Sequence, residues 1–267
     1  MSEQAAIEKT AQPNTVGTIG RDLGRLGLAA GDTALVHSSL SAIGWVCGGA
    51  VAVVQALLAV VGEQGTVVMP AHTSDNSDPA KWGNPPVPAD WIETIRATMP
   101  AFEADISLTR SMGRIAECFR TYPGTLRSDH PQMSFTANGH LARAITAQHV
   151  LTPGFGSETP LGALYRQHAK ILLLGVDYMN CTAFHLAEVL SGKGSTVPVG
   201  CALIQEGARV WRWFEDFEYD ADDFAQIGAD LDASGAVTIG QIGCATSRLV
   251  DLTVAVDFAR DWMLYHR

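Results

Sequence analysis

The sequence has 267 residues, of which 47% are hydrophobic and 17% charged, and its formal net charge is −10. A chain of this length and composition can bury a large core, as one α/β domain or two smaller ones, which excludes global disorder. The acidity disfavours nucleic acid and anionic membranes as partners and favours a cationic small molecule, although acidity can also serve solubility alone.

The cysteines and the apolar runs of the sequence indicate in which cellular compartment the protein works. The five cysteines are scattered and form no CxxC pair, so neither a disulfide framework nor a structural zinc site is expected. Residues 1–14 lack the apolar core of a signal peptide, and the longest apolar run, near residues 50–61, is too short to cross a bilayer. We therefore expect a cytoplasmic protein with no membrane partner.

The periodicity of apolar residues predicts alternating helices and strands. Residues 1–14 are expected to form a loose tail, and residues 15–267 a single domain. The expected helices cover residues 15–28, 50–61, 91–99, 110–119, 139–148, a short stretch through Tyr165, 183–190 and 250–264. The expected strands cover residues 32–37, 65–70, 133–136, 171–176, the hairpin 196–204 with 209–214, 236–239 and 242–245. This order predicts a mostly three-layer α/β/α domain with a central mixed sheet and antiparallel strands late in the chain.

One stretch, NCTAFHLAEVL at residues 180–190, combines a helix start with a candidate base. It follows a buried apolar strand, and Thr182 is the expected N-cap. His185 then lies in the first helical turn, and Glu188 is three residues later on the same face. An imidazole beside a carboxylate at the end of a core strand can act as a general base. The alternative is an ordinary His–Glu pair on a helix surface.

Two earlier strands also end in polar loops that carry histidine. His37 is followed by Ser38 and Ser39, and His72 is followed by Thr73. Ligands of open α/β sheets bind outside the carboxyl ends of strands, so we expect His37, His72 and His185 to share one edge. No HExxH or similar spacing links the histidines, so no metal site is expected.

The sequence lacks the usual signatures of nucleotide binding and serine hydrolysis. The glycine-rich loop at residues 44–49 follows a strand and precedes a helix, which suits a phosphate or a plain tight turn, but it is neither GxGxxG nor a Walker A motif. No GxSxG elbow is present. Ser38 points to the opposite strand face from His37, and Cys181 is read as a buried inert thiol, with a reactive thiol as the alternative.

An acidic segment at residues 215–232 holds eight carboxylates and no lysine or arginine. Its aromatic residues suggest that part of it packs into the core. The remaining acids form either a solvated surface or a negative wall for a polycationic ligand.

Short motifs in a fixed order along the chain resemble those of one enzyme family. They are residues 36–44 with Gly48 and Gly49, 69–73, 110–113, 119–120, 122–124, 127–128, 130–131, 134–135, 159–162, 164–165, 171–176, 185–188, 219–220, 222–224 and 227–228. Each motif is short, but their order and spacing are specific over about residues 31–258. The chain resembles the aminoglycoside 3-N-acetyltransferases.

The resemblance implies an acetyl-CoA-dependent transferase that acetylates the 3-amino group of 2-deoxystreptamine antibiotics and so confers resistance. It implies an α/β fold different from that of the GCN5-type acetyltransferases, and it leaves a homodimer open. The expected catalytic residues are His185 as general base, Glu188 as its orienting partner and His37. The expected cofactor-binding residues are Ser38, Ser39, Leu40, Gly44, Thr73, Arg110, Met112, Phe119, Ser134 and Phe135. The expected substrate-binding residues are His72, Asp75, Glu218 and Asp220.

Two positions depart from the family's usual pattern. Cys181 stands where the family commonly has asparagine, and Val189 where it commonly has tyrosine. These changes leave the substrate range open, including transfer to a different amine. Two rival hypotheses are an acyltransferase or hydrolase with a covalent intermediate at Ser38 or Cys181, and a non-catalytic binder of a cationic molecule.

Overall fold

The structure is a computed structural model that describes residues 3–267. Its largest element is a seven-stranded sheet with the strand order β3-β4-β2-β1-β5-β9-β8. The strands are β1 (Thr33–Ser38), β2 (Thr66–Pro70), β3 (Leu126–Arg127), β4 (Phe135–Gly139), β5 (Lys170–Leu174), β8 (Thr238–Ile242) and β9 (Ala245–Asp251). The expected central mixed sheet with late antiparallel strands is confirmed.

Three parallel strands form the centre of this sheet. β1 pairs in parallel with β2 and β5, and Leu35 lies opposite both Val68 and Ile171. The outer strands β4 and β9 join this centre in antiparallel orientation. The carboxyl ends of β1, β2 and β5 therefore meet at one edge of the sheet, which is where α/β sheets bind ligands.

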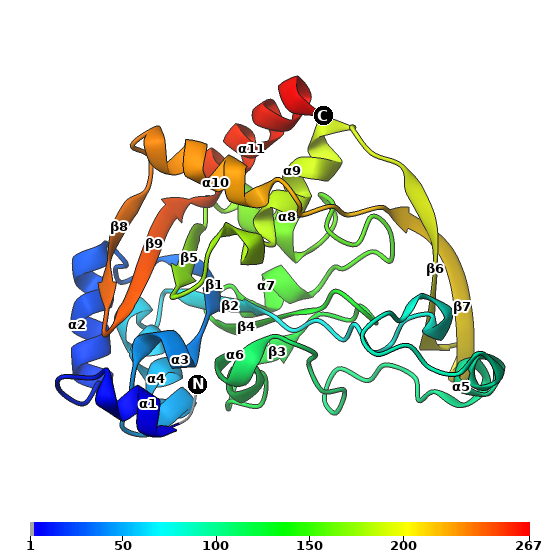
Figure 1. The fold of residues 1–267 in the computed structure, drawn as a ribbon, viewed down its shortest axis with the longest axis horizontal. Helices are drawn as coiled ribbons and strands as arrows, with labels where there is room; N and C mark the ends of the chain where they lie inside the picture. Colours follow the sequence, from blue (N-terminus) through cyan, green and yellow to red (C-terminus); the bar gives the residue numbers. More distant parts are fainter. Residues whose placement is uncertain (1–2) are drawn as a thin grey trace.

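Helices cover both faces of the sheet (Figure 1). Alternate strand residues point to opposite faces, so Leu35 packs into one core and Ala34 and Val36 into the other. One face carries α2 (Val16–Leu26), α3 (Leu40–Ile43), α4 (Gly49–Val61) and α6 (Gly113–Arg120). The other carries α7 (Ala142–Thr146), α8 (Pro160–Arg166), α9 (Ala183–Ser191), α10 (Phe224–Ala233) and α11 (Leu252–His266). The expected three-layer α/β/α architecture is confirmed.

Local signals set the boundaries of the helix α2. The Thr15 hydroxyl accepts a hydrogen bond from the backbone N–H of Thr18, which satisfies a free donor of the first turn. The helix ends at Gly27, whose φ of 107° is in the left-handed region that glycine adopts readily. The sequence therefore determines both ends of this helix, which lies within the expected range 15–28.

A long hairpin stands apart from the main sheet at one side of the molecule (Figure 1). It consists of β6 (Thr196–Gln205) and β7 (Ala208–Phe217), and it borders the segment with η1 (Pro79–Lys81), η2 (Ala89–Trp91) and α5 (Ile92–Thr98). The buried Asn76 amide donates to the Ala202 carbonyl at 2.7 Å and accepts from the Ala202 N–H at 2.8 Å. These bonds attach the hairpin to the loop that follows β2.

The N-terminal segment is more ordered than the loose tail expected for residues 1–14. Residues 3–8 form α1 (Glu3–Glu8), while residues 1 and 2 lie outside the described chain. The Lys9 ammonium donates to the Ser41 carbonyl at 2.7 Å, and the buried Asn14 amide donates to the Ile43 carbonyl at 3.0 Å. The carbonyls of the turn after β1 need donors, and this segment supplies them. No helix in residues 3–267 is long and apolar enough to cross a membrane.

Candidate active site

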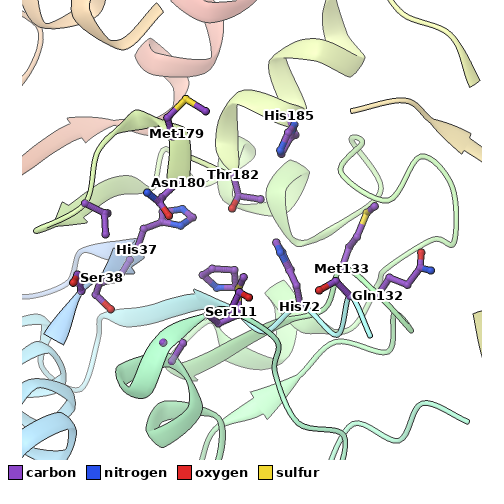
Figure 2. A pocket seen from close by; sticks show the side chains of 18 of the residues that line it. His37, Ser38, His72, Ser111, Gln132, Met133, Met179, Asn180, Thr182 and His185 are labelled. Atoms are coloured by element: carbon purple, nitrogen blue, oxygen red, sulfur yellow. The ribbon is translucent and has the colours of Figure 1, made fainter. Parts of the chain in front are cut away.

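A cavity of about 840 Å³ opens at the carboxyl ends of the three parallel strands. Its lining comes from the loops after β1, β2 and β5, the start of α6, and residues of α9 and the hairpin. Figure 2 shows that His37, His72, Thr182 and His185 surround one space, with His185 reaching into it from α9. The expectation that three histidines share the carboxyl edge of the sheet matches this geometry.

The apolar face of α9 fixes the position of His185. Ala183, Phe184 and Leu186 are almost completely buried against the sheet, and truncating a buried phenylalanine to alanine typically costs about 3–5 kcal/mol. Thr182 occupies the N-cap position but has helical angles of −56° and −24°, and its side chain makes no capping bond. The expected capping role is therefore wrong; the Thr182 side chain lines the cavity instead.

His185 is held by a completely buried carboxylate. The Nδ1 atom of His185 lies 2.5 Å from an oxygen of Glu188, whose side chain is 0% exposed. An ionised carboxylate can only accept hydrogen bonds, so the imidazole tautomer that fits this contact carries its proton on Nδ1. The second Glu188 oxygen accepts from the Asp220 N–H at 3.0 Å and from Arg267 at 2.5 Å.

Aromatic rings enclose the imidazole of His185. Phe155 stacks on it, with ring centroids 5.0 Å apart and an interplanar angle of 10°, and Tyr219 meets it edge-on, with centroids 5.2 Å apart.

The loop that carries Phe155 is hydrogen-bonded to the end of β7. Buried Asp216 accepts from the Thr152 hydroxyl and the Gly154 N–H, and the Phe155 N–H donates to the Tyr219 hydroxyl at 3.0 Å. Burial raises the pKa of Asp216.

His37 and His72 lie in a different environment at the floor of the cavity. Burial lowers the pKa of each to about 3, with nearby imidazoles contributing, so both are neutral at physiological pH. Their Nε2 atoms are buried and have no hydrogen-bond partner within the described chain. His72 also contacts the rings of Phe135 and Phe155. Two neutral imidazoles with unused nitrogen atoms thus lie beside His185.

Residues expected to bind the cofactor fall into two groups. Ser38, Ser39, Leu40 and Met112 line the cavity. Arg110 precedes the lining residue Ser111 and forms an exposed ion pair with Asp75, 3.2 Å between nitrogen and oxygen. The structure places the other five away from the lining: Gly44, Thr73, Phe119, Ser134 and Phe135.

Those five residues have structural contacts that explain their positions. Gly44, with a φ of 94°, packs against Thr10 of the N-terminal segment. The Thr73 hydroxyl donates to the Pro131 carbonyl, and the Ser134 hydroxyl donates to the Ala71 carbonyl. Phe119 and Phe135 are 0% exposed and belong to the two cores.

The acids expected to bind the substrate flank the cavity. Asp75, Glu218 and Asp220 are exposed, and each neighbours a lining residue, either Ser74 or Tyr219. Other acids of the 215–232 segment have structural partners: Asp223 pairs with Arg267, and Asp232 with Arg248 and the Tyr178 hydroxyl. The segment therefore does not form a single negative wall, and the role of its exposed acids stays a prediction.

The candidate nucleophiles lack the environment that covalent catalysis needs. Cys181 is 1% exposed, and burial raises its pKa to about 12, so the thiol is protonated and inert at neutral pH. No histidine hydrogen-bonds the Ser38 hydroxyl in the part of the chain that the structure describes. The same part contains no group of three or more His, Cys, Asp or Glu side chains arranged to hold a metal ion.

Sequence reasoning missed four residues around His185, one of which is Phe224, with its ring centroid 4.8 Å from that of the imidazole. Phe155, Tyr219 and Arg267 contact the imidazole or its carboxylate, from positions 30 to 82 residues away in the chain. Tyr219 lies within one of the family motifs, and this match could have indicated that it belongs to the site. Phe155 and Arg267 reach the site only through tertiary packing.

The fold and the site define an α/β protein with a histidine–carboxylate pair in a cavity at the sheet edge, and comparison with known proteins identifies the family. The sequence model described as Aminoglycoside 3-N-acetyltransferase matches residues 35–264. The chain belongs to this family, and the expected family membership is confirmed.

Individual relatives extend over nearly the whole chain. The aminoglycoside N(3')-acetyltransferase-like protein YokD of Bacillus subtilis is 46% identical over 97% of this chain and 95% of its own length. Its crystal structure has a TM-score of 0.97 and covers 98% of both chains at 45% identity. Aminoglycoside N(3)-acetyltransferase VII of Streptomyces paromomycinus is 35% identical over 98% of this chain and 96% of its own.

Two solved relatives carry ligands. AAC-IIIb, a binary complex with CoASH, has a TM-score of 0.83 at 32% identity and covers 94% of this chain and 97% of its own. AAC-VIa, bound to sisomicin, has a TM-score of 0.85 at 29% identity and covers 94% and 98%. The expected fold class and the expected class of enzyme, a CoA-dependent N-acetyltransferase, are confirmed.

Proposed function

We propose that this protein transfers the acetyl group of acetyl-CoA to the 3-amino group of a 2-deoxystreptamine aminoglycoside, with His185 as the general base. One observation carries the proposal: a histidine in the cavity at the sheet edge, with Nδ1 held 2.5 Å from a fully buried carboxylate. Family membership supports the substrates, and the geometry supports the assignment of the base.

In the proposed mechanism, His185 supplies the step that the amine cannot perform alone. An ammonium group has no lone pair, so the amine must be free of its extra proton before it attacks a carbonyl carbon. The Nε2 atom of His185 accepts a proton from the amine as the C–N bond forms. It returns a proton to the leaving sulfur as the C–S bond breaks. Glu188 keeps the imidazole in the correct tautomer and stabilises its transient positive charge.

His37 and His72 are proposed as neutral hydrogen-bond donors at the reacting carbonyl. Both imidazoles are uncharged at neutral pH, belong to residues that line the cavity, and have a buried Nε2 without a partner among the described residues. A donor aimed at the oxygen that becomes negative in the transition state lowers the barrier. This proposal gives His37 the catalytic role expected for it and moves His72 from general substrate binding to the reacting group. The Thr73 hydroxyl, already bonded to Pro131, is not available for this role.

The side of the cavity near α6 suits the acyl donor. Ser39, Ser41 and Ser111 present hydroxyls there, and Arg114 is an exposed cation in the first turn of α6. Hydroxyls, a guanidinium and a helix N-terminus are groups that bind phosphate, so these residues fit the diphosphate of coenzyme A. When bound, acetyl-CoA supplies the activated acetyl group.

The side near the hairpin suits the cationic acceptor. Asp75, Glu218 and Asp220 lie next to the lining and would attract a polycation, so their expected substrate-binding role becomes a proposal for long-range attraction rather than direct contact. The five cysteines are free thiols, which supports the cytoplasm as the proposed compartment. The homodimer stays a prediction, which sedimentation velocity would check.

Incubation with acetyl-CoA and an aminoglycoside tests the function. We expect release of free CoA thiol in proportion to the drug consumed, and a monoacetylated product whose NMR spectrum places the acetyl group on the 3-amine. Sisomicin and a kanamycin-type drug are suitable acceptors. If every drug of the class is returned unmodified and no thiol appears, the proposed substrate is wrong. Acetylation at another amine would refute the regiochemistry alone.

A further inference from the structure

The carboxylate that holds His185 is itself held by an arginine far away in the sequence. The Glu188 oxygen that faces away from His185 accepts from Nη1 of Arg267 at 2.5 Å and from the Asp220 N–H at 3.0 Å. The Glu188 side chain is 0% exposed, and that of Arg267 is 18% exposed. A buried carboxylate without a cation or several donors is strongly disfavoured as an anion.

The Arg267 guanidinium is fixed by further bonds on its other side. Its Nε and Nη2 atoms donate to the two oxygens of Asp223 at 2.7 and 2.6 Å, and Nη2 also donates to the Asp220 carbonyl at 2.8 Å. The hydrogen bond to Asp223, followed by those to Glu188, raises the pKa of Arg267. A planar guanidinium that is hydrogen-bonded along both edges is held in one orientation. Its bond to Glu188 then restricts the Glu188 carboxylate to one orientation as well.

Several elements meet at this network, and each contributes charged or titratable groups. Arg267 follows α11, Glu188 belongs to α9, and Asp223 precedes α10. The remaining groups are Asp220 and Tyr219 after β7, Asp216 at the end of β7, Lys193 after α9, and His37 and His72 beyond His185. The Lys193 ammonium donates to the Arg267 carbonyl and not to Glu188, so Arg267 is the cation whose charged group contacts Glu188 among the described residues.

We propose that Arg267 is a positioning residue of the catalytic site: by its ion pair it keeps Glu188 ionised and in one rotamer, which keeps the proton on Nδ1 of His185 and the lone pair on Nε2. The inference rests on the proposed role of His185 as base. Asp223 acts in turn on Arg267, so a chain of four side chains, Asp223, Arg267, Glu188 and His185, ends at the reacting amine.

The charge of Arg267 has a defined effect on proton uptake. A cation beside the His185–Glu188 pair opposes the binding of an extra proton to the pair, and its removal favours that proton. A protonated pair cannot act as the base. The acidic limb of the kcat/KM profile should therefore move to higher pH when Arg267 loses its charge. A loss of folded protein would lower the whole profile without moving this limb.

The test compares Arg267→Gln and Arg267→Lys with Arg260→Gln as the matched control. Arg260 lies on α11, pairs with Asp257 at 2.9 Å and Asp261 at 2.8 Å, and does not line the cavity. For Arg267→Gln we expect about a tenfold lower kcat at neutral pH and an acidic limb about one pH unit higher, with KM for acetyl-CoA changed less than about twofold. Arg267→Lys should restore part of both effects, because lysine keeps the charge but not the two-edged geometry. Arg260→Gln should retain the wild-type profile.

A measurement without turnover separates this proposal from the proposed function. A proton shared in a short His–Glu bond gives a far-downfield ¹H NMR signal, which His185→Ala assigns by abolishing it. We expect the signal to persist in Arg260→Gln and to be lost or shifted in Arg267→Gln. If Arg267→Gln keeps both the signal and the wild-type acidic limb, the positioning role is refuted. If the wild type acetylates no aminoglycoside but the signal still depends on Arg267, the substrate assignment fails and the positioning role stands.

Discussion

The histidines at the cavity belong to two regions that differ in whether the ring nitrogen atoms have hydrogen-bond partners. On the α9 side, His185 is bound to Glu188, and Glu188 to Arg267 and the Asp220 backbone. On the floor, the Nε2 atoms of His37 and His72 are buried and have no partner among the described residues. In the proposed mechanism the α9 side holds and passes a proton, whereas the buried imidazoles of the floor stay neutral.

The difference shows how environment, not residue type, assigns chemical roles. A carboxylate next to imidazole favours the imidazolium, and burial without a carboxylate disfavours it. The same side chain can therefore serve as a base on one wall and as a neutral donor on the floor. The following predictions test whether the two regions are as distinct as the geometry implies.

The largest expected effect comes from removing the base on the α9 side. His185→Ala should lower kcat by about two to four powers of ten, because the amine loses its proton acceptor. Binding of CoA, measured by calorimetry, should be unchanged. Near-normal turnover in this variant would remove His185 from the mechanism.

A smaller loss is expected when the base keeps its ring but loses its charged partner. Glu188→Gln preserves shape and replaces the carboxylate with a neutral amide, so the imidazolium that forms during transfer is less stabilised. We expect kcat to fall by about 10²-fold, and the thermal midpoint to drop because Arg267 loses a partner. The assay is steady-state kinetics alongside thermal unfolding. Wild-type kcat would show that the buried carboxylate serves folding only.

The buried histidines on the floor of the cavity should make the stability of the folded protein sensitive to acid. The pKa values of His37 and His72 are lowered to about 3, and those of His130 and His149 to about 4 and about 3, mainly by burial. Below an unfolded-state value of about 6.5 the unfolded chain binds more protons, so stability falls as pH drops from about 6.5 towards 4. Each such histidine contributes up to about 1.4 kcal/mol per pH unit.

Replacing one floor histidine should therefore flatten the acid dependence. His72→Phe removes one proton-binding group while keeping an aromatic ring against Phe135 and Phe155. Urea unfolding at pH 7, 6 and 5 should give a slope smaller by up to about 1.4 kcal/mol per pH unit than in the wild type. An unchanged slope would mean that His72 binds protons as readily in the folded protein as in the unfolded chain, contrary to its assignment as a neutral donor.

The smallest effect concerns the thiol that precedes α9. Cys181→Ala should change kcat by less than about twofold and cost about 1 kcal/mol of stability, because the thiol is buried packing and not a nucleophile. Rapid-mixing kinetics should show no burst of thiol release in the wild type. A burst with trapped acyl-enzyme, abolished by this substitution, would restore the covalent alternative.

The sequence predicted features that depend on local spacing. The apolar runs located the central strands β1, β2 and β5, whereas β3 was not predicted and β9 covers Ala245–Asp251 instead of the expected 242–245. The three-residue separation of His185 and Glu188 predicted that their side chains would meet. The rule for open α/β sheets placed His37 and His72 at the same edge. Short-range geometry and strand direction are sufficient for each of these results.

Features that depend on tertiary packing were not accessible in the same way. Charge patterning cannot distinguish buried Asp216 from its exposed neighbours, and no local signal links Arg267 to Glu188, which is 79 residues earlier. The resemblance assigned Phe119 and Phe135 to cofactor binding, yet both are core side chains. A motif identifies a region around a site, but burial decides which of its residues face the cavity.

The separate hairpin of β6 and β7 has an evolutionary consequence. It lines the cavity through Val199 and is attached to the body mainly through Asn76 and the neighbouring loops, not through the seven-stranded sheet. Substitutions on its exposed faces therefore disturb few contacts of the main core, and surface changes of this kind usually alter stability by less than about 0.5 kcal/mol. This wall of the cavity can diversify under selection while the His185–Glu188 pair on α9 stays constant.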